Sequence, residues 1–246
     1  MIETKSKASV FEDVVRERRS VRIYDQNAEF DQNAVKRSLE NAVLAPNSSN
    51  MQLWEFYRIK DKQTLQQLSK ACLGQQAAST AHELVVFVAR PDLWKKRQKV
   101  LLDEMKKVYE GRTDKKAKRA ISYYTKLMPM LYGKSDRFGF SDLWKKAYIW
   151  FEGLKRPVVR QVGRHDVRIT IHKSVSLAAM TFMYSMQAEG YNTCPMEGFD
   201  SKIVKNILGL PTAAEITMII GCGPAAPEGI YSERFRVANE EVIFEI

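Results

Sequence analysis

Two arginine clusters lie near opposite ends of this chain of 246 residues. The first is Arg18-Arg19-Ser20-Val21-Arg22, and the second is Arg234-Phe235-Arg236. A guanidinium group can bind a phosphate through two parallel hydrogen bonds, and a partly buried phosphate dianion needs several cationic donors. We therefore interpret the two clusters as the two halves of one anion-binding site.

A polar loop at residues 45–54 follows the first cluster and closes on an aromatic residue. Its amide and hydroxyl side chains include those of Asn47, Ser48 and Asn50, which come directly after Pro46. Such side chains hydrogen-bond sugar hydroxyls and the edges of heteroaromatic rings. Together with the arginines, the loop indicates a phosphorylated cofactor that carries a polar-edged ring.

A turn at residues 195–200 offers a different kind of hydrogen-bond donor. Pro195 and Gly198 bend the backbone, so that one amide N–H can point outward as a preorganised donor. The same residues are also typical of an ordinary loop before a helix. The sequence contains no glycine-rich phosphate loop, so the arginines are the expected phosphate ligands.

The composition is that of a globular protein, with 45% hydrophobic and 28% charged residues. Cys72, Cys194 and Cys222 are widely separated and have no metal-ligand spacing, so we expect neither a disulfide framework nor a metal site. The N-terminus lacks the apolar run of a signal peptide, and no apolar stretch is long enough to span a bilayer. These features predict a cytoplasmic protein.

The net charge of +10 is concentrated in one internal segment, residues 92–168, which holds 21 Lys and Arg against 9 Asp and Glu. We favour a solvated helix face as its explanation. Steering of an anionic dinucleotide or substrate is a second explanation. Nucleic-acid binding is the least favoured, because the aromatic residues of the segment are not interleaved with its basic residues as stacking platforms.

The hydrophobic periodicity predicts an α+β sandwich, without the strict alternation of strand and helix found in doubly wound folds. Strands are expected at residues 54–60, 84–89, 215–221 and 242–246. Helices are expected at residues 10–17, from Asp31 to just before Pro46, from Asp61 through Cys72, and at 100–109, 115–127, 169–190 and 203–208.

Two of these elements point to burial or assembly. The helix at 169–190 is apolar nearly all round, which predicts a place in the core or at a subunit interface. A free apolar strand at 242–246 would be an exposed sheet edge, so we expect it to pair with a second subunit. Residues 92–168 are interpreted as a basic helical and aromatic insertion into a single domain of residues 1–246.

Five motifs, in order along the chain, resemble those of the nitroreductase family of FMN enzymes. They are the two arginine clusters, the loop at 46–54, the Gly74-Gln75 pair and the turn at 195–200. Each motif is weak alone, but together they cover nearly the whole chain outside the insertion. The resemblance implies an FMN-binding sandwich whose central sheet is mainly antiparallel, flanked by helices, with the insertion lying over the active site.

The resemblance also implies a homodimer with two flavin sites at the subunit interface. One subunit would supply the cofactor-binding residues Arg18, Arg19, Ser20, Arg22, Gln75, Pro195, Met196, Glu197, Gly198, Arg234 and Arg236. The other subunit would supply Pro46, Asn47, Ser48 and Asn50. Within the turn, a backbone N–H would donate to flavin N5.

Three positions depart from the family's pattern. Leu53 stands where the family usually has proline, and Asn47 replaces the first serine of the loop. Ala77 stands where some members carry a basic residue near the flavin ring. Arg22 would therefore be the one basic residue of these motifs near the ring. Because positive charge there stabilises the reduced anion, this departure affects the expected flavin potential.

The function implied by this resemblance is an oxidoreductase in which NADH or NADPH reduces FMN. A nitroaromatic, quinone or related acceptor would then take the electrons in the same pocket, in a ping-pong sequence. Alternatives are an enone reductase or dehalogenase on the same scaffold, or a flavin-binding redox sensor without turnover. No catalytic side chain is assigned, because the flavin supplies the chemistry. Trp150 and Phe151 are expected either to wall the substrate pocket or to form the core of the insertion.

Overall fold

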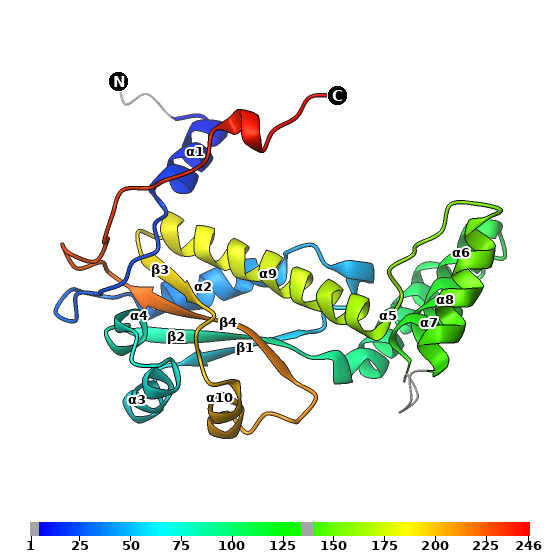
Figure 1. Cartoon of the computed structure of the whole chain (residues 1–246), viewed down its shortest axis with the longest axis horizontal. Coiled ribbons are helices and arrows are strands. Elements are labelled where there is room, and N and C mark those ends of the chain that lie inside the picture. The colour runs from blue at the N-terminus through cyan, green and yellow to red at the C-terminus, as the bar shows by residue number, and fades with distance from the viewer. Residues whose placement is uncertain (1–4, 134–139) are drawn as a thin grey trace.

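A four-stranded antiparallel sheet lies at the centre of the protein, in the order β1-β2-β4-β3 (Figure 1). The computed structural model describes residues 5–133 and 140–246. The strands are β1 Trp54–Ile59, β2 Glu83–Ala89, β3 Asn192–Met196 and β4 Glu215–Gly223. Every residue of β2 is buried, because helices cover both faces of the sheet at this central position. The predicted α+β fold and the first three predicted strands are confirmed.

The edge strand β3 was not predicted from the sequence. It contains Pro195, which has no N–H to donate to a neighbouring strand and is therefore restricted to edges and bulges. Here β3 pairs on one side with β4, where Pro195 lies opposite Ile220. On its other side it meets the N-terminal segment through a single parallel bridge between Ser20 and Thr193.

Two helical layers enclose the sheet (Figure 1). The long helix α9, Arg164–Ala188, and α2, Gln32–Val43, cover one face. The opposite face carries α3 Lys62–Ala71, α4 Gln76–Ser79 and α10 Ser201–Ile207. The predicted long helix is confirmed, although it begins earlier, where Asp166 accepts a hydrogen bond from the Gly163 amide at 3.0 Å. Its Ala178 and Ala179 are fully buried, which lets the helix pack closely on the sheet.

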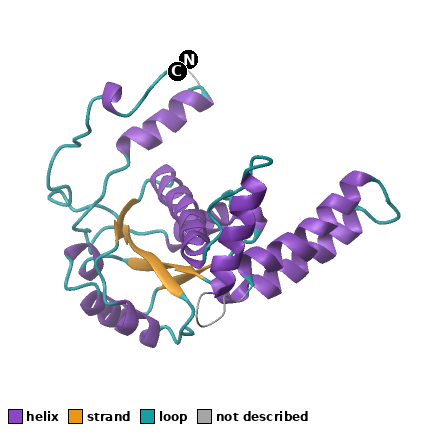
Figure 2. Cartoon of the chain, turned by 45° about the vertical axis from the view of Figure 1, so that its right-hand side comes forward, coloured by secondary structure: helices purple, strands orange, loops and turns teal. Residues whose placement is uncertain are grey.

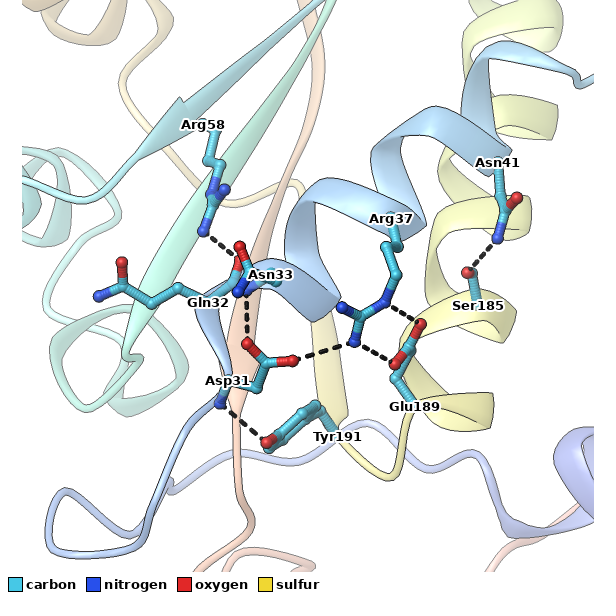
Figure 3. A network of polar contacts seen from close by, with 9 residues as sticks. All are labelled: Asp31, Gln32, Asn33, Arg37, Asn41, Arg58, Ser185, Glu189 and Tyr191. Carbon is cyan, nitrogen blue, oxygen red and sulfur yellow. Dashed lines mark hydrogen bonds and ion pairs between the residues drawn. The ribbon is translucent and has the colours of Figure 1, made fainter.

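A polar network fixes the start of α2 against the end of α9 (Figure 3). Arg37 binds Glu189 at 2.6 Å and Asp31 at 3.0 Å. Asp31 caps α2 through the Asn33 amide, while its own amide donates to the Tyr191 hydroxyl at 2.8 Å. Since the polar loop follows directly from α2, this network also determines where that loop begins.

The insertion is a helical unit that projects from the sheet-containing body (Figure 2). It consists of η2 Pro91–Leu93, α5 Trp94–Val108, α6 Lys115–Ser122, a π-helical turn Tyr123–Leu127, α7 Met128–Tyr132 and α8 Phe140–Gly153. No residue of α5 is buried, which agrees with a solvated basic face. Residues 134–139 of the predicted aromatic stretch lie outside the described residues.

The first helix and the C-terminal segment lie side by side, away from the sheet (Figures 1 and 2). Helix α1, Lys7–Glu17, has no buried residue, and the C-terminal segment passes beside it. Residues 242–246 form no strand within the single chain: they follow a short 3-10 turn, η4 Asn239–Glu241, as exposed irregular chain. A strand needs a neighbouring strand, and none of the described strands pairs with this segment, so its pairing with a second subunit stays a prediction.

The described helices include none with the length and apolar character needed to cross a membrane.

Candidate functional site

The two arginine clusters meet in one cleft of about 400 Å³. Its lining consists of Arg18, Arg19, Ser20, Arg22 and residues 230–236. The N-terminal residues enter it where α1 ends at Arg18. The C-terminal residues enter it from a segment that runs alongside α1 (Figure 1). The fold therefore joins two motifs that lie more than two hundred residues apart in the sequence.

Backbone pairing explains why the N-terminal cluster lies at this position. The Val21 amide donates to the Thr193 carbonyl at 3.1 Å, so the cluster runs along the edge strand β3. The Arg22 amide donates to the Gly229 carbonyl at 2.7 Å, which holds the start of the C-terminal segment beside it. The peptide groups of residues 20–22 are thus fixed, while the arginine side chains face the cleft.

Guanidinium groups bind backbone carbonyls across the cleft. Arg19 donates to the Ser232 carbonyl, and Arg234 donates to the Arg18 carbonyl and, at 3.4 Å, to that of Val15. These contacts leave the positive charges uncompensated. Across residues 5–133 and 140–246, no carboxylate lies within 4.0 Å of a guanidinium nitrogen of Arg18, Arg19, Arg22, Arg234 or Arg236.

The electrostatics of Arg18 show the effect of this crowding. Burial lowers the pKa of its guanidinium below the ordinary value, and the charges of Arg234 and Arg236 lower it further. A group in this environment gains from a bound anion, which would offset the mutual repulsion of the cations. The donor set and the cleft volume fit a phosphate group.

The predicted turn lies against the predicted Gly-Gln pair. Gln75 donates from Nε2 to the Gly198 carbonyl at 2.6 Å and to the Cys72 carbonyl at 3.0 Å. A Cβ at Gly198 would approach this Nε2 to 3.2 Å, so the contact favours glycine there. Next in the chain, Gln76 accepts a hydrogen bond from Tyr231 of the arginine cleft at 2.5 Å. Helix α4 therefore connects the turn with the cleft.

The residues of the turn differ in what they can offer a ligand. Pro195 belongs to β3, and the side chain of Met196 is 2% exposed in the core beneath the sheet. The side chain of Met196 is therefore not available to a ligand. Glu197 and Gly198 follow the strand and are exposed. Asp200 then caps α10 by accepting from the amides of Lys202 and Ile203 at 2.9 and 3.1 Å.

Glu197 also lines a second, more apolar hollow between α9 and β4, with a volume of about 810 Å³. Its apolar lining residues are Ile169, Leu177, Phe199 and Ile216, and its other polar ones are Arg168, His172, Lys173, Ser176 and Thr217. Nδ1 of His172 is hydrogen-bonded to the Thr217 hydroxyl at 2.9 Å, and Nε2 lies 3.1 Å from a carboxylate oxygen of Glu215. This hollow is large enough for a small organic molecule.

The polar loop lies elsewhere in the single chain. Pro46, Asn47, Ser48 and Asn50 are absent from the lining of the arginine cleft, all of whose residues the structure describes. The Ser48 amide instead donates to the Ser174 hydroxyl of α9 at 3.2 Å. Figure 1 places this loop, which follows α2, on the insertion side of the molecule and the C-terminal segment at the other end of α9. One subunit thus assembles the arginines, Gln75 and the turn, but not the loop.

Two sequence interpretations need correction or completion. Trp150 and Phe151 are 55% and 61% exposed, with their rings in edge-to-face contact at 4.9 Å, so they do not form the core of the insertion. Ala77, at the departure from the family's pattern, is buried in α4.

The sequence did not predict a role for Tyr123 and Tyr124 of the insertion, whose hydroxyls both bind Ser49 of the polar loop. No sequence signal connects residues so far apart.

Among the described residues, no cluster of His, Cys, Asp and Glu is suited to a metal ion. The structure is thus an α+β fold with a cationic cleft whose donors suit a phosphate group. Residues 15–224 match the model of the Nitroreductase family, and the chain belongs to that family.

Three similar proteins illustrate the family. MhqN of Bacillus subtilis, which carries the name NAD(P)H nitroreductase, is 22% identical over 233 residues, covering 95% of this chain and 97% of its own. A protein of Exiguobacterium sibiricum solved in complex with FMN has a TM-score of 0.62 at 21% identity, with full coverage of both chains. The enone reductase CLA-ER from a gut bacterium has a TM-score of 0.67 at 20% identity, covering 95% of this chain and 97% of its own. The two solved structures share the fold of this chain. The match to the family model confirms the family expected from the sequence.

Proposed function

We propose that this protein is an FMN-dependent NAD(P)H oxidoreductase that works as a homodimer. The observation that carries the proposal is the cleft in which five arginines meet without a carboxylate partner among the described residues. A phosphate dianion with hydroxyl groups beside it matches both the charge of this cleft and its neighbouring Ser20. Family membership and the FMN bound to a similar protein support the identity of the ligand.

In this proposal Arg18, Arg19, Ser20, Arg234 and Arg236 would hold the phosphate of FMN. Its ring would be contacted by Gln75, Arg22 and the turn formed by Pro195, Met196, Glu197 and Gly198. Gln75 is already held by the Gly198 carbonyl, so the two elements that face the ring are positioned before the ligand arrives. Bound FMN supplies the hydride chemistry, and the protein binds and orients it.

The polar loop would reach the flavin of the partner subunit. Its Pro46, Asn47, Ser48 and Asn50 are too far from the arginine cleft of their own chain to line it. The dimer itself is supported by exposed apolar surface: every residue from Ile230 to the end of the chain is exposed. Ile169 and Leu177 of α9 are about half exposed as well. Surface of this kind is typical of a protein interface.

The substrate would occupy the space beside Glu197, after the nicotinamide nucleotide has reduced the flavin and left. Nitroaromatics and quinones are the proposed acceptors, and MhqN carries a nitroreductase name. The likeness to CLA-ER favours enone reduction as a second candidate. The insertion over the active site, the single domain of residues 1–246 and the cytoplasmic location belong to the same proposal.

The first experiment is a visible spectrum of the purified protein, followed by anaerobic addition of NADH and of NADPH. We expect flavin absorption that one nucleotide bleaches and that a nitroaromatic, quinone or enone restores, which would also identify the acceptor class. A yellow protein that neither nucleotide bleaches would favour the redox-sensor alternative. A protein that cannot be loaded with FMN would refute the proposal.

A further inference from the structure

The polar loop has a strained backbone. Ser49, Asn50 and Gln52 have φ angles of 55°, 53° and 47°, in the left-handed region that residues with a Cβ rarely adopt. Three such residues within four positions persist only where the surroundings hold them in place. The loop therefore depends on its contacts, and those contacts decide where Asn47, Ser48 and Asn50 point.

Part of the support comes from the body of the protein. Asn47 accepts a hydrogen bond from the Gln52 amide at 2.8 Å, which closes the loop on itself. The Ser48 amide donates to Ser174 of α9. Neither contact involves the central residue of the loop, Ser49.

The insertion supplies the contacts to Ser49. The hydroxyl of Tyr123 lies 2.6 Å from the Ser49 hydroxyl, and the hydroxyl of Tyr124 donates to the Ser49 carbonyl at 3.1 Å. Both tyrosines belong to the π-helical turn, and their rings meet edge to face at 5.2 Å. Burial raises the pKa of Tyr124, so its hydroxyl stays protonated as a donor.

A hydrogen bond from α5 stabilises this turn. Gln98 donates from Nε2 to the Tyr124 carbonyl at 2.6 Å. Consecutive side chains of an α-helix diverge by about 100°, so two neighbours seldom reach the same residue. Wider π turns within helices occur frequently at functional sites. Here the wide turn accompanies two neighbouring hydroxyls that bind one loop residue.

We propose that Tyr123 and Tyr124 are positioning residues for the flavin site. They hold Ser49, and through it they set the directions of Asn47, Ser48 and Asn50 toward the flavin of the partner subunit. This inference rests on the proposed function of the loop. It gives the insertion a role in cofactor binding that its basic surface does not reveal.

The test compares wild type with Tyr123→Phe, Tyr124→Phe and the double variant. Phenylalanine keeps the packing of the rings and removes only the hydroxyls. Tyr57→Phe is the matched control, because its hydroxyl binds Glu55 at 2.8 Å in β1, outside the loop. Two readouts are needed: the dissociation constant of FMN from flavin fluorescence, and hydrogen exchange of the amides of residues 48–52 in the protein without flavin.

We expect the double variant to bind FMN about tenfold more weakly, since a hydrogen bond contributes about 1 kcal/mol and a tenfold change in affinity is about 1.4 kcal/mol. Its loop amides should exchange faster, while the control matches wild type in both readouts. Ser49→Ala removes the partner of Tyr123, so its effect and that of Tyr123→Phe should be less than additive.

The outcomes separate the two proposals. If wild type does not bind FMN, the proposed function fails and the positioning role fails with it. If wild type binds FMN and the double variant binds it equally well, only the positioning role is refuted, whatever the exchange rates show. Weaker binding in the double variant and not in the control supports it.

Discussion

At the scale of single residues, the arginine cleft concentrates charge that the folded chain does not neutralise. Arg18 is the most informative of its members, because burial and two neighbouring arginines act together to lower its pKa. Such a site is unfavourable when empty and favourable when an anion occupies it. The consequence is a sharp dependence of ligand affinity on individual guanidinium groups.

Arg18→Ala and Arg236→Ala should each weaken FMN binding by about ten- to hundredfold, because a hydrogen bond to a charged group contributes about 1.5–3 kcal/mol. The double variant should lose less than the sum, since both groups bind one phosphate. Isothermal titration with FMN measures this. Arg16→Ala is the control, because Arg16 pairs with Glu12 on the exposed side of α1. Fully additive losses would place the two arginines at separate sites.

A pH effect is expected from Glu215. Burial acts to raise its pKa, but hydrogen bonds from His172 and Arg168 hold it below the ordinary value of 4.5. The folded state therefore prefers the ionised form, and this contribution to stability is complete above pH 4.5. It is lost as the pH falls from there through the lower pKa of the folded state.

Glu215→Gln tests this sign. The free energy of unfolding, measured in urea, should be lower in the variant at neutral pH, and the difference from wild type should shrink at a pH below 4.5. A difference that grows on acidification would contradict the assignment.

At the scale of elements, an ion pair joins the two strands β1 and β2 beneath helix α2. Arg58 binds both carboxylate oxygens of Glu83 at 2.5 and 2.7 Å, and the Glu83 side chain is 1% exposed. Arg58 also donates to the Gln32 carbonyl at the start of α2 (Figure 3). The pair therefore connects the sheet with the helix that leads into the polar loop.

Arg58→Met should destabilise the protein by about 3–5 kcal/mol, because it leaves a buried carboxylate without a partner. Changing Glu83 to Met as well should recover much of this loss, since no buried charge then remains. Urea unfolding followed by circular dichroism gives both values. Arg16→Met, at an exposed pair, should change stability by less than about 1 kcal/mol. If Arg58→Met also lowers the free energy of unfolding by less than about 1 kcal/mol, the Glu83 carboxylate has found water or another partner, and the prediction is wrong.

At the scale of the whole molecule, the C-terminal segment exposes apolar side chains that a monomer in water would not favour. Phe244 is 73% exposed, and Val242 and Ile243 are about 60% exposed. The segment also carries the arginines of the cleft, so assembly and cofactor binding depend on the same stretch of chain.

Phe244→Asp should raise the dissociation constant of the dimer at least tenfold, because a fully buried phenylalanine contributes about 1.5–3 kcal/mol. Glu245→Gln, one residue further, is the matched control and should leave it unchanged. Sedimentation velocity over a range of concentrations distinguishes them. A wild type that is monomeric throughout would contradict both the dimer and the reach of the polar loop into a partner site.

The sequence alone determined the features whose signals are local. A helix that is apolar nearly all round and a continuous apolar run predicted α9 and the buried strand β2, and the motifs predicted the family. Strand β3 was missed because Pro195 argues against a strand unless the strand lies at an edge, and that position depends on the whole sheet. The pairing of residues 242–246 with a second subunit stays a prediction, because a strand needs a neighbouring strand and the single chain supplies none among its described residues.

The tertiary structure decided which of the predicted residues meet. The residue types had suggested one anion site for Arg18 and Arg236, and the structure places both in one cleft. Sequence spacing could not show that Gln75 holds the Gly198 carbonyl or that the loop at Asn47 lies elsewhere. Nor could it connect Tyr123 with Ser49. Local preferences act over a few residues along the chain, whereas these contacts arise where distant segments meet: the two chain ends along β3, the turn beside α4, and the insertion beside the polar loop. Residue types therefore determined the chemistry, and the packing determined where it can take place.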